Sequence, residues 1–218
     1  MQELLSAVDR SHATMPLDVL AGLTLLSIIP LLLVTCTSFV RIVVVLSLVR
    51  SALGASALPP NAVLAGLALV LTGVTMGPTF DRVAREAIAP YARGQLLPSQ
   101  ALERAAEPLR SFMLRQARVA DLSLFERVAR HARVDPQRAP LDILVPAFVV
   151  GELRSAFAIG FALYLPFVAI DLVVAAILMG LGMVMLSPPV VSLPVKLLLF
   201  VMADGWALVC GGVVASFR

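Results

Sequence analysis

Residues 141–215 contain only six charged side chains in 75 positions, a pattern that excludes an ordinary soluble domain. Surroundings this apolar offer no water to the backbone, so every N–H and C=O group must be paired within the structure. Helices meet this requirement within one segment. The whole chain is 60% hydrophobic, against about 45–50% in soluble proteins. We therefore predict an all-α, integral membrane-type protein.

Prolines divide the apolar block into pieces near the length of a membrane span. Proline removes a backbone donor and clashes with the preceding helical turn, so we expect the prolines to cut the block into separate helices. Pieces of about 20 residues are long enough to cross a bilayer. The predicted helices cover residues 146–165, 166–186 and 190–215.

The N-terminal part contains two further apolar runs. Residues 19–49 form either one long kinked helix or two shorter ones, and residues 62–76 form a run that is short for a full span. The loop at residues 50–61 carries no acidic side chain, which favours the cytoplasmic side. The first eighteen residues lack the basic start and the cleavage site that are typical of a secretory signal peptide.

Residues 81–142 differ from both flanks, because they contain eleven arginines and eight acidic residues. One helix is predicted at residues 100–118, with Pro108 expected to kink or split it. A second is predicted to open at a capping box, Ser123-x-x-Glu126. We expect a small, water-exposed helical insert. Three regions follow: an apolar helical region (1–80), the charged insert (81–142) and C-terminal helical hairpins (143–218).

Charged side chains within the apolar block each need a partner, because a charge at the centre of a bilayer costs about 2.5–3.5 kcal/mol even on insertion scales. The five in question are Glu152, Arg154, Asp171, Lys196 and Asp204. Glu152 and Arg154 are two positions apart on a helix, so they point in different directions and favour partners on other helices or other chains.

A methionine-rich turn lies between Asp171 and Lys196. Residues 178–189 combine two glycines, three methionines and a proline pair, which predicts a flexible apolar turn able to seal an opening. Asp171 precedes Met183 by 12 residues and Lys196 follows Met185 by 11, so a hairpin would place the two charges at a similar height. They either form a bridge or both face a wet or protein-lined interior.

Catalytic and ligand-binding motifs are lacking in the sequence. It has no H-E-x-x-H, no G-x-S-x-G and no phosphate-binding glycine loop, and Cys36 and Cys210 match no metal or redox spacing. No basic stripe interleaved with aromatic residues indicates nucleic-acid binding. Asp171 and Asp204 raise the hypothesis of an intramembrane aspartyl protease, but neither has the Gly-x-Gly-Asp surroundings of that class. We expect no enzymatic activity, cofactor or metal.

Several ordered blocks of the chain, together spanning about residues 23–216, resemble the FliP family of type III export-gate proteins. The blocks are residues 37–46, 48–54, 59–61, 108–116, 120–122, 145–148, 151–157, 170–173, 183–185, 192–197 and 204–206. The resemblance implies an inner-membrane subunit of the apparatus that exports proteins through flagella or injectisomes. It also implies a homopentamer that joins FliQ-like and FliR-like subunits in a helical pore complex, with hairpins largely above the membrane plane.

The family's methionine loop, which forms a gasket around the closed pore, matches Met183 and Met185. Val184 stands where the family usually has a third methionine, and Val195 replaces a common phenylalanine before Lys196. The missing signal peptide is typical of injectisome members, whereas the block at residues 108–125 is closer to flagellar ones, and we favour the flagellar system.

The resulting hypothesis is a non-enzymatic pore subunit that contacts membrane lipid and passes unfolded secreted proteins. Met183, Val184 and Met185 would form the gate. Five charges would hold subunits in register: Glu152, Arg154, Asp171, Lys196 and Asp204. Arg41 is a further candidate for a buried or inter-subunit charge. A small-solute membrane transporter is the alternative, and it predicts uptake by the purified chain alone.

Overall fold

The computed structural model describes residues 27, 30–54, 59–129, 135, 139–183 and 185–217. Within these ranges the regular structure is entirely helical, as predicted. A helix at Pro30–Cys36 precedes the labelled elements. These are α2 (Phe39–Leu53), α3 (Asn61–Val83), a π-helical turn η1 (Ala84–Ile88), α4 (Ala89–Ala92), α5 (Pro98–Gln116), α6 (Val119–Val128), α7 (Leu141–Gly180), α8 (Pro188–Met202) and α9 (Gly205–Ala215).

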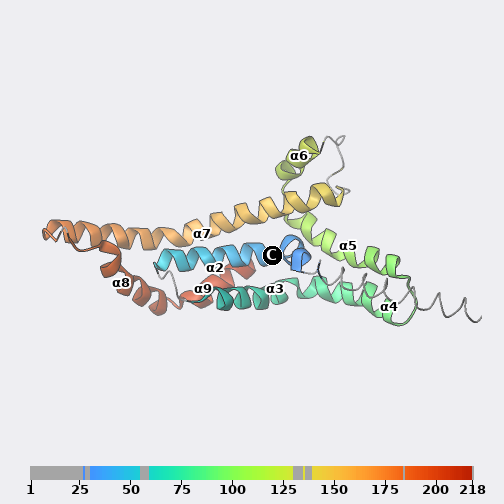
Figure 1. Cartoon of the computed structure of the whole chain (residues 1–218), viewed down its shortest axis with the longest axis horizontal. Coiled ribbons are helices and arrows are strands. Elements are labelled where there is room, and N and C mark those ends of the chain that lie inside the picture. The colour runs from blue at the N-terminus through green and yellow to red at the C-terminus, as the bar shows by residue number, and fades with distance from the viewer. Residues whose placement is uncertain are drawn as a thin grey trace, which may run out of the picture.

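The molecule is elongated, and α7 runs along most of its length (Figure 1). Helix α2 packs mainly against α7 and also against α3, while α8 folds back along α7. The turn between α7 and α8 lies at one extreme end of the molecule, and α5 and α6 lie toward the other (Figure 1). This arrangement separates the methionine-rich turn from the charged insert.

Two apolar clusters hold these helices together. The first is centred on α2, whose Ile42, Val45, Leu46 and Val49 are almost fully buried at the spacing of one helical face. They pack with side chains of α3, α7, α8 and α9. The second cluster joins α3, α5, α6 and the start of α7 around the buried ring of Phe148. The core therefore links the charged insert to the apolar part of the chain.

Helix α7 continues for 40 residues through both Pro146 and Pro166, so the predicted breaks at these prolines are wrong. Each proline removes one donor, but the neighbouring turns keep their hydrogen bonds in an apolar setting that offers no other partners. Packing of the buried Phe148, Ala156 and Phe167 also holds the axis in place.

The last predicted helix, residues 190–215, is two helices. Helices α8 and α9 meet at a bend of 65°. Asp204 at this bend has a left-handed backbone, with φ 48° and ψ 50°. Aspartate tolerates that conformation better than most residues, because its short side chain can bond locally.

The N-terminal helices settle one open alternative. Pro30–Cys36 and α2 meet at a bend of 78°, so the described part of residues 19–49 forms two helices and not one. The apolar run at residues 62–76, which is short for a span, is part of a longer helical segment. Helix α3 continues through Pro78 into η1 and α4, so the combined segment Asn61–Ala92 has 32 residues.

The charged insert contains both predicted helices, but the second begins earlier than predicted. Helix α5 runs through Pro108 without a split. Helix α6 already begins at Val119, so Ser123 lies inside it, and its hydroxyl donates to the carbonyl of Ala120 at 2.9 Å. The predicted capping box is therefore wrong. Burial of Asp121 and Leu122 against α7 places the first turn earlier than the local cap signal does.

The expected region boundaries fall at different places in the fold. The boundary after residue 80 lies inside α3, and the boundary after residue 142 lies in the first turn of α7. The predicted boundaries were placed where the density of charged residues changes, whereas α3 and α7 continue across these positions.

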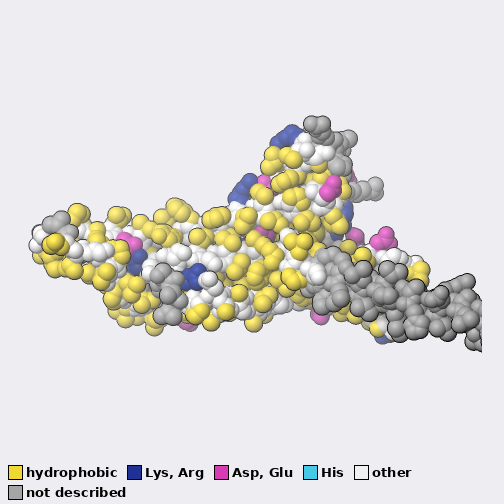
Figure 2. Space-filling model, viewed as in Figure 1, with side chains coloured by type: hydrophobic (Ala, Val, Ile, Leu, Met, Phe, Trp, Pro, Cys, Tyr) yellow, Lys and Arg dark blue, Asp and Glu magenta, His cyan; other side chains and the backbone are white. Residues whose placement is uncertain are grey.

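Among the described residues, two helical segments, Asn61–Ala92 and Leu141–Gly180, are long and apolar enough to cross a membrane, and the two bent pairs would raise that number to four. Figure 2 shows hydrophobic side chains over most of the visible face, with arginines gathered around the α6 arm. Only 11% of the most apolar window of α7 is buried within the chain. Most of this surface must therefore contact lipid or other protein.

Candidate functional site

The methionine-rich turn begins where α7 ends in a Schellman motif. Gly182 has φ 74°, its N–H donates to Met179 at 3.0 Å, and the N–H of Met183 donates to Leu178 at 2.9 Å. Only glycine adopts such a φ without cost, so Gly182 fixes where the helix stops. Pro188 and Pro189 occupy the first positions of α8, where a missing N–H costs nothing. The turn is thus short and bounded on both sides.

Side chains of the turn project away from their own chain. Met185 is fully exposed, Met183 is 42% exposed, and Leu181 and Met179 are also mostly exposed. Val184 lies outside the described residues. Exposed apolar side chains at the tip of a hairpin gain stability only when another surface covers them. The geometry therefore presents methionine thioethers to whatever surrounds the tip.

Lys196 joins three helices beneath this tip. Its ammonium donates to the Asp171 carboxylate at 2.6 Å and to the carbonyl of Ala52 at 3.2 Å, and Lys196 is only 5% exposed. Ser192 donates to the other Asp171 oxygen at 2.5 Å. Of the two arrangements left open for Asp171 and Lys196, the chain itself forms the bridge. The Ala52 carbonyl lies in the last turn of α2, where carbonyl groups have no N–H partner within the helix. Lys196 donates to this carbonyl and therefore also caps α2.

A second charged cluster surrounds Arg41 near the middle of the molecule. Its guanidinium forms a two-pronged pair with Glu152, at 2.8 Å and 2.5 Å, and both side chains are almost fully buried. Further bonds run to the carbonyl and hydroxyl of Ser216 at 2.9 and 3.0 Å and to Gln116 at 3.1 Å. The ring of Phe217 stacks 3.8 Å from the guanidinium carbon. Arg41 thereby joins α2, α5, α7 and the end of the chain.

Arg154 has a different environment from Glu152, as their spacing indicates. It pairs with Asp121 on α6, with nitrogen–oxygen distances of 2.9 and 3.2 Å. Asp121 is buried, but Arg154 is half-exposed. This pair ties the α6 arm to α7.

Asp204 is exposed at the α8–α9 bend, and among the described residues its carboxylate has no bonded partner. Both oxygens of Asp171 bond to Lys196 and Ser192, and Asp204 is not one of the groups that bond to it. The chain thus does not bring these carboxylates together as a protease dyad requires. No three His, Cys, Asp or Glu side chains lie close enough to share a metal ion in the ranges that the structure describes.

Sequence reasoning missed the neutral members of these clusters. Gln116, Ser192, Ser216 and Phe217 are ordinary residues in a helical sequence, and nothing in their local pattern marks them. The available signal was indirect: Arg41 lies in an apolar run, so it must have a partner. Asp121 was missed because the charged insert contains eight acidic residues, and the sequence does not show which of their carboxylates is buried.

Comparisons with known proteins agree with one another. The sequence model of the FliP family matches residues 22–213. The flagellar biosynthetic protein FliP of Pectobacterium carotovorum subsp. carotovorum is 49% identical over 205 residues, which cover 94% of this chain and 80% of that protein. The protein of the same name from Bacillus subtilis is 42% identical over 98% of this chain and 97% of its own length. That from Caulobacter vibrioides is 48% identical over 91% and 76%.

Proposed function

The chain belongs to the FliP family, and from this premise we propose that it is a pore-forming subunit of the flagellar protein export apparatus in the bacterial inner membrane. In this proposal several copies, five by family resemblance, assemble with FliQ-like and FliR-like subunits and gate the passage of unfolded secreted proteins. The names of the relatives support a flagellar system over an injectisome.

The observation that carries this proposal is the contrast between the tip and its support. Met185 is uncovered by its own chain and Met183 is partly exposed, while the arms that present them are joined by the Asp171–Lys196 bridge. Methionine is unbranched and polarisable, so several copies can pack around a small opening and adapt to a chain passing through it. A rigid support with a soft apolar tip is suited to a reversible seal.

The exposed helices support assembly. Isolated apolar faces on α7, α8 and α9 include Phe157, Leu172, Val201 and Leu208, each more than half exposed. A ring of copies with smaller helical partners would cover one side of these faces and leave the other for lipid. Asp204 at the bend is then an acceptor for a donor on a neighbouring subunit, and Arg41, Glu152, Arg154, Asp171 and Lys196 keep the helices in register.

The seal is tested by replacing Met183 and Met185 together with alanine in cells that carry the assembled apparatus. We expect normal assembly and increased ion permeability of the inner membrane, because two flexible side chains per copy are shortened at the opening. Met202→Ala is the matched control, since Met202 is also exposed but lies at the far end of α8. Unchanged permeability in a correctly assembled double variant would overturn the gate assignment.

The transporter alternative is separated from the pore by a simpler measurement. Vesicles containing only the purified chain should take up no small solutes, because in this proposal the pore is complete only with the FliQ-like and FliR-like subunits. Uptake by the chain alone would favour a transporter.

A further inference from the structure

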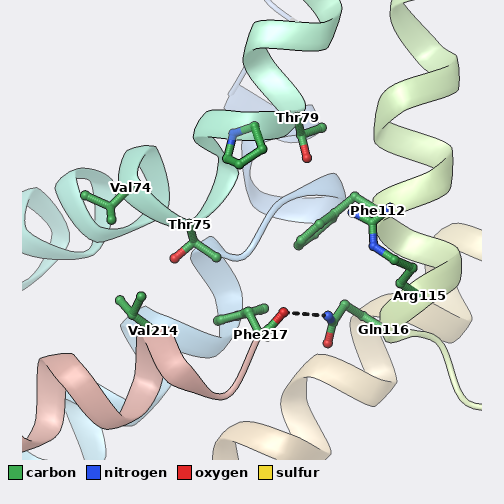
Figure 3. A pocket seen from close by; sticks show the side chains of 9 residues that line it. Val74, Thr75, Thr79, Phe112, Arg115, Gln116, Val214 and Phe217 are labelled. Carbon is green, nitrogen blue, oxygen red and sulfur yellow. Dashed lines mark hydrogen bonds between the residues drawn. The ribbon is translucent and has the colours of Figure 1, made fainter.

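A cavity of about 340 Å³ lies where α3, α5 and the end of the chain meet. In Figure 3 the α5 side chains Phe112, Arg115 and Gln116 lie across the cavity from Val74 and Thr75 of α3, with Phe217 between them. The remaining lining residues are Pro78, Thr79 and Val214. The cavity is separate from the methionine-rich turn, and the pore proposal gives it no role.

The two ends of the cavity differ in chemistry. Val74 and Val214 are apolar, and Val74 continues along one face of α3 to the exposed Val70, one turn earlier. The other end carries Thr79, Arg115 and Gln116. Here α3 passes from its apolar run, which ends near Met76, to the charged residues that begin at Asp81. The cavity is thus amphipathic and lies at a boundary between apolar and charged surface.

Hydrogen-bond donors without acceptors dominate the polar end. Arg115 is exposed and forms no ion pair or hydrogen bond with the residues that the structure describes, and no carboxylate lines the cavity. The Thr79 hydroxyl is likewise without a bonded partner in the described ranges. In contrast, Thr75 donates to Leu71 at 2.9 Å, and both ends of the Gln116 amide are engaged by Arg41 and Phe217.

We propose that this cavity binds an anionic glycerophospholipid. Arg115 donates to the phosphate in the two-pronged geometry that guanidinium favours, and Thr79 donates a further bond. An acyl chain lies along Val214, Val74 and Val70. A zwitterionic headgroup fits less well, because its ammonium would find no carboxylate in the lining. A free phosphate would leave the apolar wall uncovered.

The test is native mass spectrometry of the full chain in detergent, with added phosphatidylglycerol or phosphatidylcholine of identical acyl chains. We expect preferential retention of one phosphatidylglycerol per chain. Arg115→Gln should weaken this binding about tenfold, the effect of losing one good charge-assisted contact, and Thr79→Val should weaken it less. Arg127→Gln is the matched control, because Arg127 is exposed on α6 and does not line the cavity.

Three results would overturn the proposal. The first is equal retention of the two lipids, and the second is unchanged binding in Arg115→Gln with helical content preserved by circular dichroism. The third is displacement of the lipid by millimolar inorganic phosphate, which would show an anion site without a lipid component. Loss of assembled copies in Arg115→Gln, with lipid retention unchanged, would instead assign Arg115 to a carboxylate of a second copy.

Discussion

At the scale of single residues, a few buried charges determine how the helices align, which contacts between apolar side chains alone do not determine. Arg41 is the clearest case, because its guanidinium has five nitrogen–oxygen contacts on three different segments. Apolar helix faces can slide along one another with little loss of contact. A planar group with fixed donor directions permits one register only.

Arg41→Lys should therefore destabilise the chain although it keeps the charge. An ammonium cannot make the two-pronged bond to Glu152 and also reach Ser216 and Gln116, so we expect a loss of about 3 kcal/mol, as when a buried pair is broken. Thermal unfolding of the detergent-purified protein measures the effect. Arg50→Lys is the control, since Arg50 bonds, among the described residues, to Pro59 and to Asn61 at the start of α3. Equal melting temperatures for the two variants would contradict this role of Arg41.

Lys196→Met should be more damaging alone than together with Asp171→Asn. The single change removes the counter-charge of the Asp171 carboxylate, which keeps only the bond from Ser192, and the donor to the Ala52 carbonyl. Asparagine at 171 needs no counter-charge. We expect the single variant to lose about 1–3 kcal/mol and the double variant to recover part of it. The measurement is a double-mutant cycle by thermal unfolding. Strict additivity would show that the bridge contributes nothing.

At the scale of elements, the bend between α8 and α9 depends on one close contact. A Cβ atom on Gly205 would lie 2.3 Å from the ring of Phe200, which packs edge-on against Trp206 and beside Phe167. No side chain fits in that space without moving the ring. The bend sets the direction in which α8 returns from the methionine-rich turn toward the core.

Gly205→Ala should therefore destabilise the bend by about 1–3 kcal/mol, the usual cost of overpacking. Gly211→Ala is the matched control, because nothing lies within 4 Å of a Cβ atom there and alanine favours helix. Thermal unfolding of both variants gives the comparison. A stable Gly205→Ala protein would show that Phe200 moves aside freely.

At the scale of the whole molecule, the long exposed helices leave a large apolar surface for lipid or for other protein chains. In the part of the chain that the structure describes, two apolar clusters are well buried, one centred on α2 and one around Phe148, while α7 presents most of its apolar surface outward. We expect native mass spectrometry of the extracted chain, co-expressed with its FliQ-like and FliR-like neighbours, to show a complex with several copies. A monomer both alone and after co-expression would contradict the proposed assembly.

The sequence alone predicted the class of fold and the residues in need of partners. An apolar block with six charges allows few structures other than helices, and unpaired charges in it are conspicuous. The spacing of Asp171 and Lys196 around the turn made a bridge one of two alternatives, and the structure shows the bridge. The assignment of Met183 and Met185 to a gate rests on family resemblance and stays a prediction.

Tertiary structure decided where the helices end and which groups meet. Pro146, Pro166 and Pro108 all lie inside continuous helices, because burial of neighbouring side chains outweighs one lost hydrogen bond. By contrast, the predicted helix at residues 190–215 bends at Asp204, a position without a proline. Phe200 packs there against Gly205. Local signals such as proline or a capping box describe what a segment does by itself, whereas contacts between distant segments, such as Arg41 with Ser216, depend on the whole fold.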